Sequence, residues 1–162
     1  MEILIVYAGK TGTTEKCAGI LGQKLKTATI INLNAENADI SKYDFVIVGS
    51  SIRIGMLHGK VKDFIKKNKE TLLTKKAAYY ICCAFPDQYK EYFEKGIPKQ
   101  LLDSAITYNT FGGEMDISKQ KGFAKFIVKM VSKTEERKKG AKINYENIDE
   151  FVKKVEKEIT KK

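Results

Sequence analysis

The chain has 162 residues, 43% hydrophobic and 31% charged, and its 30 Lys and Arg against 20 Asp and Glu give a net charge of +10. This length predicts a single domain, 1–162, and no apolar run approaches the ~18 residues that a transmembrane segment needs. The first apolar run lacks the basic leader of a signal peptide, so we expect a cytoplasmic protein whose charge favours an anionic ligand, partner or surface.

Apolar runs alternate with helical periodicities along the chain, which is typical of a βα repeat and a parallel sheet. Buried strands are expected near 2–7, 28–33, 44–49, 77–84 and 105–111, because each run is apolar enough to be covered on both faces. Helices are expected at about 13–26, 59–70, 87–103 and 147–160, packed on the sheet. The fold class is therefore α/β, with all five strands parallel and no antiparallel pair within the first 111 residues.

One further helix is expected between the fifth strand and the last helix, at about 119–133. The segment 117–142 carries nine basic residues against two acidic ones, a difference of +7. Lysines recur at four-residue intervals along one polar edge of this helix, which is either a solvated face or a surface for an anionic membrane. Nucleic-acid binding is not expected, because no recognition motif is present. The four lysines are Lys121, Lys125, Lys129 and Lys133.

Glycine, lysine and threonine residues in the run "GKTGTT" follow the first strand and open the first helix. Helix N-termini in this position bind anions, because their first backbone N–H groups are unpaired and carry the positive end of the helix dipole. The run lacks the lysine of a nucleotide-triphosphate loop and the GxGxxG of a dinucleotide site, which favours a terminal monophosphate. The alternative is a threonine-rich helix cap that binds nothing.

A second motif, "VIVGSSIRIGMLHGKVKDFIKKN" at 46–68, ends the third strand in a glycine and serine loop. With this motif the chain resembles the flavodoxins, and within them the flavodoxin-like family of the bacterial menaquinone-dependent protoporphyrinogen oxidase. The resemblance covers nearly the whole chain and is strongest at 1–16, 46–68 and 111–155. It implies a doubly wound three-layer sandwich with strand order 2-1-3-4-5 and FMN as the cofactor.

The resemblance also implies which residues contact FMN: the first loop holds its phosphate, and the loops after the third and fourth strands flank the isoalloxazine ring. Gly9 stands where the family usually has Ser or Thr, and Ile54 where an aromatic residue often stacks on the ring. The implied residues are Gly9, Lys10, Thr11, Gly12, Thr13 and Thr14 for the phosphate, Ser50, Ser51, Ile52, Arg53, Ile54 and Gly55 beside the ring, and Cys83, Ala84, Phe85 and Pro86, matched by position, in the fourth-strand loop.

Two functions remain open at this stage, and the sequence does not decide whether the protein is an enzyme. The first is an electron carrier that passes electrons through a non-covalent flavin to a redox partner protein. The alternative is a quinone-linked FMN-dependent protoporphyrinogen IX dehydrogenase, peripheral at the inner face of the membrane. His58 is either a helix cap or a proton donor, and Cys82 and Cys83 are either core thiols or redox-active. No cluster of residues has metal-ligand spacing, so no metal is expected.

Overall fold

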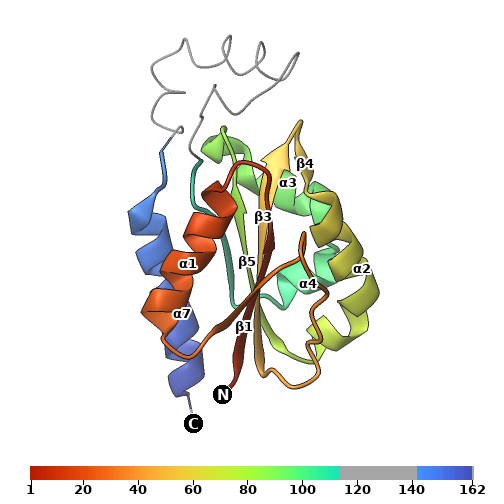
Figure 1. Cartoon of the computed structure of the whole chain (residues 1–162), viewed down its shortest axis with the longest axis vertical. Helices are drawn as coiled ribbons and strands as arrows, with labels where there is room; N and C mark the ends of the chain where they lie inside the picture. Colours follow the sequence, from red (N-terminus) through yellow and green to blue (C-terminus); the bar gives the residue numbers. More distant parts are fainter. Residues whose placement is uncertain (114–141, 162) are drawn as a thin grey trace.

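The computed structural model of the chain describes residues 1–113 and 142–161, and a parallel sheet forms its centre (Figure 1). The parallel strands are β1 (Ile3–Ala8), β2 (Thr29–Asn32), β3 (Phe45–Arg53), β5 (Lys76–Cys82) and β6 (Thr107–Thr110). Their order is β2-β1-β3-β5-β6, which confirms both the five predicted strands and their order. Every residue of β1 is buried, as expected for a strand covered on both faces.

A sixth strand, β4 (Met56–Leu57), was not predicted. It pairs with the end of β3 in antiparallel register, Ile52 with Leu57 and Arg53 with Met56. The expectation of no antiparallel pair within the first 111 residues is therefore wrong. A two-residue strand carries no measurable periodicity, and the Ile54–Gly55 turn that joins it to β3 lacks the usual Asn-Gly or Asp-Gly signal.

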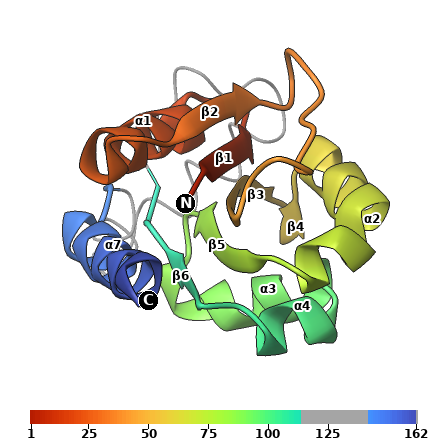
Figure 2. The same ribbon diagram turned by 90° about the horizontal axis from the view of Figure 1, so that it is seen from below.

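Helices cover both faces of the sheet, as predicted (Figure 2). One face carries α1 (Thr13–Leu25) and α7 (Tyr145–Thr160), and the other carries α2 (Gly59–Leu73), α3 (Tyr89–Gly96) and α4 (Lys99–Asp103). Successive side chains of each central strand point to opposite faces, so the sheet divides the apolar residues into two cores. The fold is thus a three-layer sandwich.

The single helix predicted at 87–103 is wrong. The structure has a short 3-10 helix, η1 (Pro86–Gln88), then α3, and then a separate α4. Ile97 between the two α-helices is extended, with φ −123° and ψ 132°. Pro98 accounts for the break, because a proline disfavours helical backbone in the residue before it. Pro98 is itself the N-cap residue of α4.

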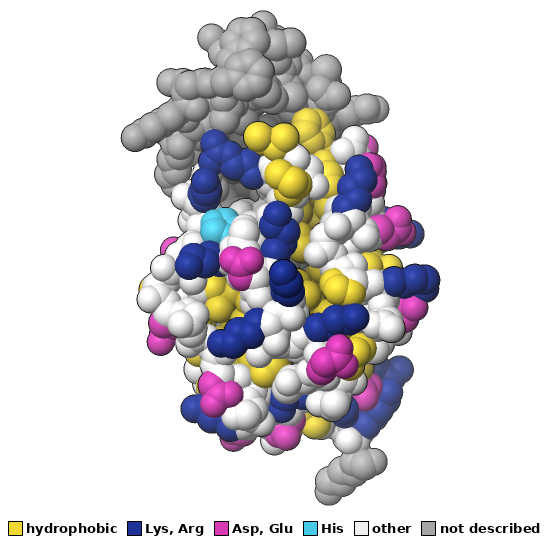
Figure 3. All heavy atoms as spheres, turned by 90° about the vertical axis from the view of Figure 1, so that its right-hand side faces the viewer, with side chains coloured by type: hydrophobic (Ala, Val, Ile, Leu, Met, Phe, Trp, Pro, Cys, Tyr) yellow, Lys and Arg dark blue, Asp and Glu magenta, His cyan; other side chains and the backbone are white. Residues whose placement is uncertain are grey.

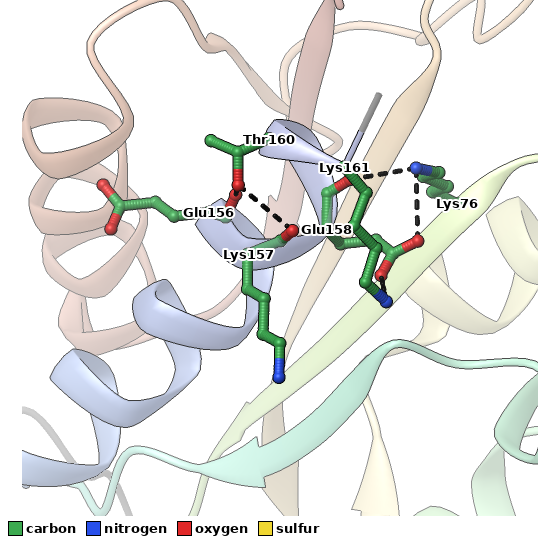
Figure 4. A network of polar contacts seen from close by, with 6 residues as sticks. All are labelled: Lys76, Glu156, Lys157, Glu158, Thr160 and Lys161. Carbon is green, nitrogen blue, oxygen red and sulfur yellow. Dashed lines mark hydrogen bonds and ion pairs between the residues drawn. The ribbon is translucent and has the colours of Figure 1, made fainter.

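Polar contacts attach the last turn of α7 to the start of β5, far from the carboxyl ends of the strands (Figure 4). The ammonium of Lys76 lies 3.2 Å from the carboxylate of Glu158 and donates a hydrogen bond of 3.0 Å to its backbone carbonyl. Lys161 binds the same carboxylate at 2.7 Å. Hydrogen bonds from Lys161 and then Lys76 lower the pKa of Glu158. This network attaches the end of α7 to the sheet.

The basic helix predicted at 119–133, with Lys121, Lys125, Lys129 and Lys133, lies outside the described residues. Within 1–113 and 142–161, no helix combines the length and the apolar character that crossing a bilayer requires.

Candidate functional site

Three loops meet at the carboxyl ends of the central strands: 9–12 after β1, 50–55 at the end of β3, and 83–86 after β5 (Figure 1). The strand register brings them together, because Ala8 pairs with Ser50 and Ser51 pairs with Cys82. A Cβ built on Gly9 would lie 3.8 Å from the side chain of Ser51. The structure thus gathers the three predicted groups of site residues at one end of the sheet, where open α/β sheets bind ligands.

The first loop ends at Gly12, which precedes α1 with φ 89°. A left-handed residue at this point is favourable only for glycine, since a side chain would strain the backbone. Among the described residues, no side chain caps this helix. The backbone N–H groups of Thr13 and Thr14 are the first of α1 and have no partner inside the helix. They present partial positive charge at the end of the loop, which suits an oxyanion.

Gly9 is required by its neighbour rather than by its own conformation. A Cβ at Gly9 would lie 2.8 Å from Oγ1 of Thr14 and 2.9 Å from its Cβ. The buried Thr14 side chain therefore occupies the space that a serine or threonine at Gly9 would need. Asn34, which the sequence analysis did not select, donates a hydrogen bond of 3.0 Å from its side chain to the Gly9 carbonyl. That bond fixes where the loop leaves β1.

The start of α1 is supported from below by Tyr80 of β5, another residue that the sequence analysis missed. The Tyr80 hydroxyl donates a buried hydrogen bond of 3.0 Å to the backbone carbonyl of Thr14. Burial raises the pKa of Tyr80 well above its ordinary value, so the hydroxyl stays a donor. Its ring stacks on Phe111 at a centroid distance of 4.7 Å. The ring also occupies the space beside Gly49, where an added Cβ would lie only 2.1 Å from it.

Side chains at the end of β3 hold the second loop in place. The buried Ser50 hydroxyl donates to the Ser51 carbonyl and accepts from the backbone N–H of His58, both at 2.9 Å. His58 caps α2 by accepting from the backbone N–H of Lys60 at its Nδ1. Burial and then the charges of Lys10 and Lys60 lower the pKa of His58, which keeps Nδ1 an acceptor. His58 therefore acts in this structure as a helix cap.

The tip of the β3–β4 hairpin is formed by Ile54 and Gly55, both with positive φ, 50° and 71°. Positive φ at both central residues is the requirement of a type I′ turn, and it is unusual for a β-branched residue. The side chain of Ile54 is 81% exposed and that of Met56 57% exposed. Hydrophobic side chains gather at the top of the face shown in Figure 3, with Lys and Arg side chains beside them. The tip thus combines backbone strain with exposed apolar surface.

The third loop begins at Cys83, whose buried thiol lies 3.3 Å from Oγ1 of Thr110 and donates to the Phe85 carbonyl at 3.6 Å. Its backbone N–H donates to the Gly112 carbonyl. Ala84, Phe85 and Pro86 are half-buried. This loop is therefore anchored to the end of β6.

The described residues provide no metal site, and a hollow elsewhere on the surface is separate from the three loops. Among residues 1–113 and 142–161, no group of three His, Cys, Asp or Glu side chains is placed to hold a metal ion. A hollow of about 410 Å³ lies at the amino ends of the strands, lined by residues that include Ile3, Leu25 and Glu156. This is the end of the sheet opposite the three loops, so the hollow is separate from them.

Comparisons with known proteins agree with the fold. The flavodoxin domain family matches residues 4–142. A protoporphyrinogen IX dehydrogenase (quinone) of Escherichia coli K12 is 23% identical over 171 residues, covering 96% of this chain and 94% of the relative. Two solved structures share the fold: the two-electron reduced flavodoxin of Megasphaera elsdenii, with TM-score 0.52, 20% identity and coverage of 67% of this chain and 84% of its own, and a flavoprotein of Lactobacillus acidophilus NCFM in complex with FMN, with TM-score 0.50, 14% identity and coverage of 67% and 92%.

Proposed function

The chain belongs to the flavodoxin domain family, and from this premise we propose that it binds one FMN non-covalently and transfers electrons through it. The observation that carries the proposal is the start of α1 at the carboxyl end of β1, where Gly12 at φ 89° precedes a helix N-terminus that no described side chain caps. A phosphate monoester fits this set of donors, because it is a small dianion that accepts several backbone hydrogen bonds at once.

Each loop has its own task in this proposal. The 9–14 segment binds the phosphate through backbone N–H groups and the hydroxyl of Thr11. The 50–55 segment and 83–86 border the ring, with Ile54 in place of an aromatic residue. When bound, FMN supplies the redox chemistry, and the protein binds it, orients it and sets the charge around it. Arg53, which is exposed beside the hairpin tip, would favour negative charge on the reduced ring.

The phosphate assignment is tested by titrating the protein with FMN and with riboflavin, which lacks the phosphate. We expect FMN to bind at least tenfold more tightly, since charged hydrogen bonds at a helix N-terminus contribute about 2–4 kcal/mol in sum. Equal affinities would overturn the assignment.

A matched pair of glycine variants locates the phosphate. The added methyl of Gly12→Ala has no atom of the described residues within 4 Å, but it forces a side chain onto φ 89°. Gly19→Ala, in the middle of α1, likewise has none of these atoms within 4 Å and has no such strain. Backbone strain of about 1 kcal/mol should displace the loop in Gly12→Ala and weaken FMN binding about fivefold. The FMN affinity of Gly19→Ala should be unchanged. If Gly12→Ala weakened riboflavin by the same factor, the loop would be a scaffold without phosphate contacts.

A second function is favoured by one observation, the relative named protoporphyrinogen IX dehydrogenase (quinone), which aligns with 96% of this chain. Under this alternative the protein oxidises a reduced porphyrin and passes electrons to a membrane quinone. The cytoplasmic chain would then be peripheral at the inner face of the membrane, held by Lys121, Lys125, Lys129 and Lys133 and the net charge of +10. Under the carrier reading the partner is another redox protein.

The two functions are separated by an anaerobic assay of the FMN-loaded protein with protoporphyrinogen IX and a water-soluble menaquinone analogue. Turnover that produces fluorescent porphyrin and depends on the quinone supports the enzyme. Absence of turnover, with electron exchange to a redox protein intact, supports the carrier.

A further inference from the structure

Two cysteines from distant parts of the chain face each other beneath the first loop. The thiol of Cys82 donates to the sulfur of Cys17, with 3.7 Å between the two Sγ atoms, although the two residues are 65 positions apart in sequence. Cys17 lies on α1, four residues after the first residue of that helix, and Cys82 is the last residue of β5. Both side chains are buried and neither is in a disulfide.

The third cysteine is adjacent in sequence but separate in space. Cys83 belongs to the apolar core on the other face of the sheet, whereas Cys17 and Cys82 share the core under α1 and α7. Its sulfur contacts Thr110 and the Phe85 carbonyl instead. The alternation of side chains along an extended chain accounts for this difference. Cys83 therefore provides an internal control for any reaction that depends on the pairing.

The environment of the pair restricts how it can react. The hydrogen bond with Cys17, followed by burial, raises the pKa of Cys82 well above its ordinary value. Since the thiolate is the nucleophile, oxidation has to be slow at neutral pH and to accelerate as the pH rises. Because both sulfurs are buried, the oxidant has to be small. Exposed cysteines would not restrict the size of the oxidant.

We propose that Cys17 and Cys82 form an oxidisable pair, which a small hydroperoxide converts to an intramolecular disulfide. One thiol, as its thiolate, attacks the terminal oxygen of the hydroperoxide and forms an S–O bond. The O–O bond breaks, the other oxygen takes up a proton and leaves as water or alcohol, and the sulfur becomes a sulfenic acid. The second sulfur displaces the hydroxyl of the sulfenic acid as water, and the S–S bond forms. In sum, two thiols lose two electrons and two protons, and one hydroperoxide is reduced.

The cross-link acts on the anion site through α1. A disulfide requires an S–S distance of about 2.0 Å, so the two sulfurs have to approach from their present 3.7 Å. Cys17 lies one helical turn from Thr13, and the neighbouring Thr14 is bonded to Tyr80 of the same strand as Cys82. Drawing α1 toward β5 therefore displaces the backbone N–H groups that begin the helix. The cross-link itself does not rest on the proposed FMN binding, whereas this coupling does.

The pairing is tested on the full chain with two single variants. Cys83→Ser keeps the facing pair, and Cys82→Ser keeps Cys17 and Cys83, which lie on opposite faces of the sheet. Each reduced protein is treated with hydrogen peroxide, quenched, alkylated and mapped by non-reducing peptide mass spectrometry. We expect an intramolecular cross-link between the Cys17 and Cys82 peptides in Cys83→Ser and none in Cys82→Ser. The rate in Cys83→Ser should rise at least fivefold from pH 7 to pH 9.

Three results would overturn the pairing: two free thiols in Cys83→Ser after exhaustive treatment, a cross-link through Cys83 in the wild type, or a cross-link between two chains. The wild type is mapped in parallel, so a folding defect in either variant does not decide the outcome. The coupling is read from FMN titrations, in which oxidised Cys83→Ser should bind FMN at least threefold more weakly than its reduced form. Unchanged affinity in a fully cross-linked sample would refute the coupling and leave the cross-link standing.

Discussion

The first loop and the β3–β4 hairpin lie side by side at the carboxyl end of the sheet, yet they are built in opposite ways. The first loop is held from inside the protein by the buried Tyr80 and Thr14, which leave little room for change, and Asn34 bonds to it from the exposed side. The hairpin presents its tip to solvent, with Ile54 81% exposed and in a strained conformation. The first loop is supported by buried packing, whereas the tip of the hairpin takes its shape from its own turn.

This difference follows from what each loop has to contact in the proposed site. A phosphate is small and invariant, so its donors are best preorganised by a rigid support. A ring edge or a docking partner offers apolar surface, which an exposed isoleucine can cover on binding. Strained backbone conformations, such as that of Ile54, are typical of functional positions. The comparison therefore predicts that changes below the first loop cost stability, while changes at the hairpin tip cost binding.

The largest effect is expected from Gly49→Ala, because the new side chain clashes with Tyr80, which supports the first loop. The added Cβ would lie 2.1–2.3 Å from three atoms of the Tyr80 side chain, all in the buried core. We expect the free energy of unfolding to fall by about 3 kcal/mol or more, because the ring has no space to move into. Urea denaturation measures the change. Gly59→Ala, where no atom of the described part of the chain lies within 4 Å, is the control, and its stability should stay near that of the wild type.

A smaller loss is expected from Tyr80→Phe, which keeps the ring and removes one hydrogen bond. The Thr14 carbonyl loses its donor from β5, so stability should fall by about 1–2 kcal/mol and FMN should bind more weakly. Tyr79→Phe is a close control on the same strand, because the buried Tyr79 hydroxyl has no hydrogen-bond partner among residues 1–113 and 142–161. Its removal should leave stability unchanged or raise it. Equal losses in the two variants would mean that the bond to Thr14 contributes nothing.

The hairpin is expected to respond in the opposite direction to Ile54→Asn. Asparagine tolerates positive φ and precedes Gly55, so the turn gains the favoured sequence and the free energy of unfolding should rise by about 1 kcal/mol. The apolar surface is lost at the same time, so FMN or partner binding should weaken. Gly55→Ala tests the turn alone and should destabilise it, since φ 71° disfavours a side chain. A variant that gained both stability and affinity would end the assignment of Ile54 to the site.

The smallest effect concerns His58 and acid. Its pKa is lowered in the folded protein from 6.5, so the unfolded chain takes up the proton first as the pH falls. The stabilising contribution is therefore complete above about pH 7 and declines as the pH falls below about 6.5. Protonation of Nδ1 also removes the cap on Lys60, for a total of at most about 1 kcal/mol. His58→Asn, which caps without titrating here, should lack this decline in urea denaturation at pH 7 and pH 5.5; an identical slope in both proteins would contradict it.

Sequence patterns predicted the sheet because its central strands are buried on both faces. Runs such as Ile3–Ala8 are apolar throughout and need no partner to be recognised. The same reasoning missed β4, which is too short to show a period, and joined α3 to α4 across Pro98. That second error was avoidable, since a proline within a helical pattern ends the helix at the preceding residue. Local pattern is therefore informative where the burial of an element does not depend on distant residues.

The site was predictable in part for a related reason. Parallel strands bring their carboxyl ends together, so glycine, serine and threonine runs after strands were expected at one edge. The residues that support those runs were not expected, because Tyr80 reaches Thr14 across 66 positions and Asn34 reaches Gly9 across 25. Gly9 and Gly49 are likewise explained only by side chains from other segments. Contacts between distant segments leave no periodic signal in the sequence.

The two edge strands of the sheet affect how the protein behaves in a crowded solution. The outer strands β2 and β6 have only four residues each, whereas β1, β3 and β5 have six, nine and seven. An open sheet edge is a template on which another chain can add a strand, which is a first step of aggregation. Short edges offer few backbone groups for such a ladder, even though Ile30 on β2 is 40% exposed. The long, apolar strands that are most prone to self-association thus lie in the interior of the sheet, where neighbouring strands already pair with their backbone groups.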